Sequence, residues 1–190
     1  PRQFFLIYYG GDGDRDAAPI GEAEQSQSKY AKSYISSQDL GIYAPTTIMT
    51  YHEQKFIEAE AQLRTDGDWE TALQEAIEAS FDFYGLTYFG EVPGGSDYAE
   101  AIVQSLDGAD DEVILEEIMT QKYIAMYEYR SMTAYNDYRR TGYPEMHNPN
   151  NDDKGFPHRY PYALSETQSN PDNVPDVSIY EDKLFWAKED

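Results

Sequence analysis

Carboxylates are the residues of this sequence whose types and spacing first suggest chemistry. Asp12, Asp14 and Asp16 alternate along a glycine-rich stretch, as successive ligands do in a calcium-binding loop. An EF-hand would also need glycine at position 17 and glutamate at position 23, where the chain has Ala17 and Ala23. A solvated acidic turn is therefore the favoured interpretation and no metal site is predicted, although the sequence does not decide whether a calcium ion binds.

Catalytic motifs have little support. His52 and Glu53 begin an HExxH zinc-protease pattern, but position 56 is Phe56, so Glu53 is better explained as the capping partner of Thr50 at a helix start. The chain has no cysteine, and a nucleophile elbow, a P-loop and a GxGxxG motif are all missing from the sequence. Carboxylate pairs are many, but none is singled out by the apolar setting that glycoside hydrolysis requires. The residues alone therefore predict no cofactor and show no catalytic motif, whereas the many carboxylate pairs leave glycoside hydrolysis open.

Tyrosines form the second group that suggests chemistry. The chain has 18 Tyr, 8 Phe and 2 Trp, and such rings pack in a core or offer flat faces to sugars and peptides. A set in the irregular segment 8–43 is predicted to bind ligand: Tyr8, Tyr9, Asp12, Asp14, Tyr34 and Tyr43. The alternative for each of these tyrosines is that it anchors the core or a loop.

Helices must position these groups, and they are expected in the middle of the chain. Residues 1–48 are loop-rich with a short strand at 3–9, whereas 49–142 form a helical core with helices near 50–65, 69–84, 97–106, 112–129 and 131–140. Gly142 and Pro144 end the last helix. Residues 143–190 show no helical period until the closing "KLFWAKED" and are expected to wrap the helices as an ordered coil. The prediction is a single, mainly α domain over 1–190.

The first two predicted helices are joined by the short turn "TDGD" and should pack antiparallel as a helical hairpin. Small residues occur where the helices must approach each other: Ala59, Ala61, Ala72, Ala76 and Ala79. This pattern is typical of a tetratricopeptide-type unit, of which about three are normally stacked. Since only one is found, an ordinary helical hairpin is the alternative.

The charge balance excludes some partners. Lys and Arg total 14 against 36 Asp and Glu, a net charge of −22, which repels phosphate backbones and anionic headgroups. The sequence therefore predicts no nucleic-acid partner. No stretch reaches the roughly 18 apolar residues of a membrane span, and the first residues carry no signal-peptide pattern. Hydrophobic residues at 40% argue against disorder.

Four segments in order resemble the SusD/RagB-like family of outer-membrane nutrient-binding lipoproteins of Bacteroidetes. These are "MTYHEQKFIEAEAQLR" (49–64), "ALQEAIEASFDFYG" (72–85), "EEIMTQKYIAMYEYRSMTAYNDYRRTGYP" (116–144) and "RYPYALSETQSNP" (159–171). The resemblance covers about the last three-quarters of the chain and implies a SusD-like C-terminal region. It also implies that an N-terminal part of the natural protein, with further helices and a lipid anchor on the outer membrane, precedes this chain.

The resemblance implies a function without bond chemistry. An oligosaccharide, bound at the bacterial surface, would be delivered to a TonB-dependent SusC-like transporter. Peptide capture, as in the RagB-like branch, and a helical-repeat scaffold that binds proteins are the alternatives; a glycan-cleaving enzyme is a third. The sequence does not distinguish sugar from peptide. The arginines Arg139, Arg140 and Arg159 are expected to tie the last helix to the coiled tail, because a guanidinium bridges several acceptors at once.

Overall fold

The structure is a computed structural model that describes residues 46–85, 93–126, 130–146 and 155–187. Within these ranges the chain is helical and contains no strand, which confirms the prediction of a mainly α fold. The predicted strand at 3–9 lies outside the described residues. None of the helices in these ranges is long and apolar enough to span a bilayer.

A helical hairpin of α3 (Tyr51–Leu63) and α4 (Trp69–Tyr84) starts the described part. Both predicted caps are present: the Thr50 side chain accepts a hydrogen bond from the Glu53 N–H, and the Asp68 side chain accepts one from the Thr71 N–H. Ala59, Ala72 and Ala76 are buried at the contact, which lets the two backbones approach closely, as predicted. The prediction is wrong for Ala61, which is exposed, and Ala79 is only partly buried.

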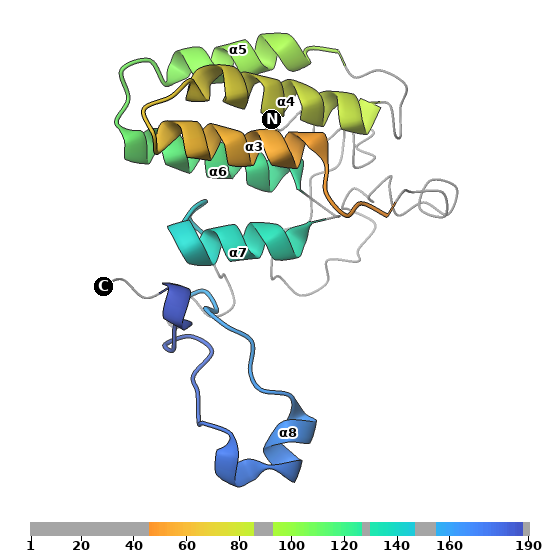
Figure 1. Cartoon of the computed structure of the whole chain (residues 1–190), viewed down its shortest axis with the longest axis vertical. Helices are drawn as coiled ribbons and strands as arrows, with labels where there is room; N and C mark the ends of the chain where they lie inside the picture. The colour runs from red at the N-terminus through yellow and green to blue at the C-terminus, as the bar shows by residue number, and fades with distance from the viewer. Residues whose placement is uncertain (1–45, 86–92, 127–129, 147–154, 188–190) are drawn as a thin grey trace, which may run out of the picture.

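Three more helices complete the packed body. They are α5 (Gly95–Ser105), α6 (Asp111–Ala125) and α7 (Ser131–Thr141). In Figure 1, α5 lies beside α4, α6 beside α3, and α7 forms the next layer below them. The core joins Phe56, Leu73 and Ile77 of the hairpin to Ile118 and Met119 of α6. These helices lie within a few residues of the predicted ranges.

The C-terminal tail differs from the expected coil. It contains the short helix α8 (Leu164–Ser169) and two single-turn helices, η3 (Pro171–Asn173) and η4 (Phe185–Ala187). A helix of six residues with one apolar side chain has no period that a sequence pattern can reveal. The tail also does not wrap the helices along its length: η4 packs on α7, whereas residues 161–169 are exposed on an arm that extends away from α7 (Figure 1).

Candidate functional site

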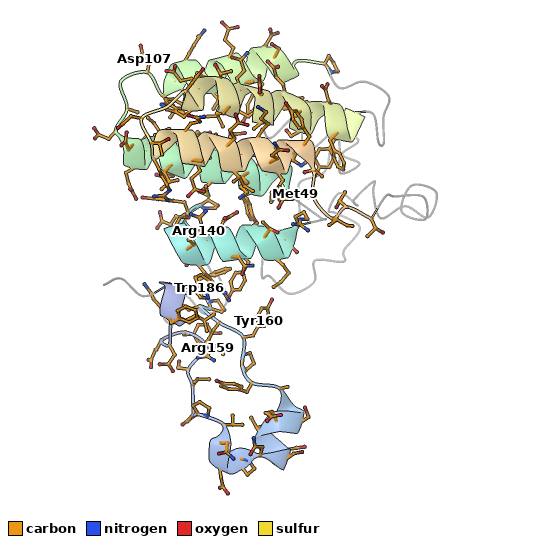
Figure 2. All side chains as sticks on the ribbon, viewed as in Figure 1. Met49, Asp107, Arg140, Arg159, Tyr160 and Trp186 are labelled. Carbon is orange, nitrogen blue, oxygen red and sulfur yellow. The ribbon has the colours of Figure 1, made fainter. Side chains whose placement is uncertain are left out.

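Helix α7 carries two sets of side chains that serve different neighbours. Successive residues of an α-helix are about 100° apart around its axis, so Arg139 and Arg140 point in different directions. Arg140 and Asp137 make ion pairs with α3 and α6, whereas Tyr135 and Arg139 contact the tail. In Figure 2, Trp186 lies on the side of α7 that faces the tail.

Ion pairs fix α7 to the helical body. Arg140 donates to both carboxylate oxygens of Glu60 on α3, with an Nη2–Oε2 distance of 2.8 Å, and also pairs with Asp137. Asp137 in turn lies 2.7 Å from the Nζ of the buried Lys122 on α6. Burial raises the pKa of Glu60, but the hydrogen bonds and charges of Arg140 and Arg64 outweigh it, so this pKa lies below its ordinary value. The pairs hold α7 in one orientation.

Aromatic rings fill the contact between α7 and the tail. Tyr138 meets Phe156 edge-on at 5.0 Å between ring centroids, and Tyr135 meets Tyr160 at 5.9 Å. The Tyr135 hydroxyl also donates a 2.7 Å hydrogen bond to the carbonyl of Pro157. Such ring pairs and a satisfied hydroxyl are typical of a specific docking contact. They set the start of the tail against the end of α7.

A hollow of about 280 Å³ lies where α7 meets both ends of the tail, and we call it the α7–tail cavity. Its lining is Tyr138, Arg139, Arg140, Thr141, Gly142, His158, Lys183, Trp186 and Ala187. The Arg139 guanidinium lies over the rings of Tyr135 and Trp186, at 4.8 and 4.5 Å from their centroids. Burial, together with the charge of Lys183, lowers the pKa of His158, so this imidazole is neutral at pH 7. The cavity thus offers cations, a neutral imidazole and ring surface.

A second hollow of about 450 Å³ lies on the α3–α4 hairpin. It is lined by Tyr51, His52, Glu75, Glu78, Ala79, Asp82 and Phe83. Its carboxylates are partly engaged, since Glu75 lies 2.7 Å from Lys55, and Glu78 accepts hydrogen bonds from Gln74 and Ser96. No group of residues in the described ranges has the arrangement of a metal site. This groove is acidic, in contrast to the α7–tail cavity.

Gly142 makes the turn from α7 into the tail. It sits at φ +83° in the left-handed region, and its N–H closes the helix on the Tyr138 carbonyl at 2.7 Å. The Tyr143–Pro144 peptide bond that follows is cis.

Gly142→Ala should lower the free energy of unfolding by about 1 kcal/mol, because a Cβ disfavours this φ although nothing crowds it in space. Urea unfolding followed by circular dichroism measures the change. Gly142→Asn is the matched control, since asparagine tolerates the left-handed region and should cost less. Equal losses from both substitutions would contradict the explanation.

The predicted site residues fall into two groups. The predicted ligand set (Tyr8, Tyr9, Asp12, Asp14, Tyr34 and Tyr43) lies outside the described residues and stays a prediction. The structure corrects the expected partners of two arginines: Arg140 binds Glu60 on α3 rather than the tail, and Arg159 contacts Tyr160 and Tyr162 within the tail itself. Arg139 is the arginine that joins α7 to the tail.

Sequence reasoning missed three residues of the cavity. His158, Lys183 and Trp186 belong to the tail, and no motif connects them to α7. The apolar cluster around Trp186 near the chain end was the one signal that could have indicated a docked segment.

Comparison with known proteins places the chain in a family. A SusD-like family model described as "Starch-binding associating with outer membrane" matches residues 8–163. A solved SusD/RagB family protein from Bacteroides thetaiotaomicron VPI-5482 is 28% identical with a TM-score of 0.65, over 98% of this chain and 48% of that one. A SusD homologue from Bacteroides fragilis NCTC 9343 is 26% identical with a TM-score of 0.60, over 77% of this chain and 36% of that one.

A third solved structure, the Bacteroidetes AC2a SusD-like protein, is 26% identical with a TM-score of 0.62, over 77% of this chain and 31% of that one. No curated protein sequence matches significantly. The chain thus spans from about a third to about half of the length of these solved relatives. Since the family model covers most of its residues, this chain belongs to the SusD-like family of starch-binding, outer-membrane-associated proteins.

Proposed function

We propose that this chain is part of a non-catalytic protein that binds an oligosaccharide at the bacterial outer-membrane surface and delivers it to a TonB-dependent SusC-like transporter. Family membership supports glycan binding and the outer-membrane location. The lipid anchor would lie in a segment outside this chain. The transporter partnership rests on the family alone, and copurification of the full-length protein with a SusC-like transporter tests it.

The observation that carries the proposal to this chain is the α7–tail cavity with its aromatic edge. Trp186 is 40% exposed beside the cavity, so part of its ring surface is available to the C–H face of a sugar. Arg139 and Lys183 supply donors and His158 supplies a donor or acceptor for hydroxyl groups. At about 280 Å³ the cavity is at the small end of ligand pockets, which suits one residue of a longer oligosaccharide.

The lining also supports binding without cleavage. Glycoside hydrolysis needs a carboxylic acid and a second carboxylate on either side of the scissile bond. Among the described residues that line the α7–tail cavity there is no Asp or Glu. A sugar held there would meet donors and rings but no acid–base pair from these residues.

Titration calorimetry against a panel of neutral oligosaccharides, beginning with maltotriose, tests the proposal. Trp186→Ala should weaken glycan binding about tenfold, which corresponds to about 1.4 kcal/mol, because the stacking surface is lost. Phe185→Ala is the matched control, since Phe185 is the neighbouring ring, is 86% exposed and does not line the cavity.

Three results would contradict the proposal. Binding of peptides with no binding of any glycan would favour the RagB-like alternative. Release of reducing ends from a bound polysaccharide would show an enzyme instead of a binder. Equal effects of the two alanine substitutions would remove the cavity from the binding site.

A further inference from the structure

The α7–tail cavity has an unusual charge for this chain. Acidic residues outnumber Lys and Arg by 36 to 14, yet the part of the lining that the structure describes contains three cations and no carboxylate. Arg140 is one of the three, but it already pairs with Glu60 and Asp137. Lys183 is not without a partner either. Arg139 is therefore the cation of the three whose surroundings need an explanation.

Arg139 lacks the acceptor that every comparable arginine has. Among the residues that the structure describes, Arg64, Arg130 and Arg140 each pair with a glutamate, and Arg159 donates to the Tyr160 carbonyl. Arg139 has ring contacts but no hydrogen bond or ion pair in these ranges, and its Nε is buried without an acceptor. The Nε of Arg130 is likewise buried without an acceptor, but Arg130 still pairs with Glu53. Arg139 differs because its guanidinium has no acceptor in the described ranges and lines the cavity, where a ligand can supply one.

The chemistry of a guanidinium narrows the acceptor. Its planar fork of donors matches a carboxylate, which it binds through two parallel hydrogen bonds. The ring contacts with Tyr135 and Trp186 hold the group in place without supplying an acceptor. Lys183 adds a second cation to the same lining, while the neutral His158 can bond a hydroxyl.

From this geometry we infer that the α7–tail cavity binds an acidic sugar residue, such as a uronic acid, with its carboxylate on Arg139. The inference rests on the proposed function, because the exposed part of the Trp186 ring beside the cation is what favours a sugar over other carboxylates. It adds a substrate class, an anionic glycan, and names the residue that selects it.

Calorimetry with trigalacturonate and its fully methyl-esterified form isolates the carboxylate, because the two ligands share a backbone and differ in charge. The acid should bind at least tenfold more tightly than the ester. Arg139→Gln should abolish this preference, and Arg139→Lys should retain part of it, since charge remains but the fork is lost. Arg159→Gln, which removes a guanidinium outside the cavity, should leave the preference unchanged. Circular dichroism confirms that each variant is folded.

The outcomes separate the inference from the proposed function. Equal affinity for acid and ester, alongside binding of neutral glycans, overturns the inference and leaves the proposed function intact. No binding of any glycan overturns both. Triglutamate that binds as tightly as trigalacturonate, and through Arg139, overturns the assignment to a sugar.

Glu189 and Asp190 of the same chain are another source of a carboxylate for Arg139, and a Glu189→Gln/Asp190→Asn variant removes this competitor. Trigalacturonate that binds neither the natural chain nor a Glu189→Gln/Asp190→Asn variant also overturns the inference.

Discussion

Replacing Asp137 by alanine is expected to lower the free energy of unfolding by about 3–5 kcal/mol. The Asp137 carboxylate lies 2.7 Å from the Nζ of Lys122, and the two side chains are only 14% and 5% exposed. Loss of the aspartate leaves the ammonium group of Lys122 buried on α6 without its partner, and an uncompensated buried charge is among the most destabilising changes known. Urea unfolding at pH 7, followed by circular dichroism, gives the difference.

The double substitution Lys122→Met/Asp137→Leu is the control for this prediction. Because it removes both charges and fills the space with apolar groups, it should recover most of the lost stability. A double variant as unstable as Asp137→Ala would show that packing, and not the unpaired charge, causes the loss. An Asp137→Ala variant within 1 kcal/mol of the natural chain would contradict the prediction outright.

Acid is expected to destabilise the fold through His52 before it affects the ion pairs. His52 lies in the first turn of α3, is 3% exposed and meets the Phe83 ring edge-on at 5.1 Å. Burial lowers the pKa of His52 to about 4 from its ordinary value of 6.5. The folded protein therefore takes up this proton less readily than the unfolded chain, so stability is full above pH 6.5 and is lost progressively down to about pH 4. Between pH 7 and pH 5 the loss should be about 2 kcal/mol.

His52→Gln should remove that pH dependence, and unfolding measured at pH 7, 6 and 5 tests it. The lowered pKa of Glu60 does not interfere, because its contribution is lost only below the ordinary glutamate pKa of 4.5. His158→Gln is the comparison, since burial also lowers the pKa of His158 but this residue is less buried, so a smaller change is expected. An unchanged slope in His52→Gln would contradict the assignment.

The α3–α4 hairpin shows how much the local sequence determines. Thr50 and Asp68 satisfy backbone N–H groups within the same turn, and the helical spacing of Phe56, Leu73 and Ile77 marks the buried faces. These are interactions between residues three or four positions apart, so a sequence pattern contains them completely. The same holds for Gly142, whose position after α7 predicts the left-handed turn found there.

Glu53 shows where local reasoning stops. The sequence pattern predicts a capping box, and the Glu53 N–H does bond to Thr50, but its carboxylate accepts from Arg130 at 3.0 Å. Arg130 is distant in sequence, and the ion pair forms only because α7 packs against the body. A pattern of spacing within one helix holds no information about which distant charge arrives beside it.

By itself the sequence determined helices α3 to α7, the N-caps of α3 and α4, the hairpin and the family, because periodic apolar residues and short-range hydrogen bonds define them. Only the tertiary structure decided which way each of two adjacent arginines points, Arg140 to the carboxylates of α3 and α7 and Arg139 to the rings of the tail. The α7–tail cavity likewise joins α7 to residues near the end of the chain. Its shape and charge depend on how α7 and the tail pack together, and no local pattern records that contact.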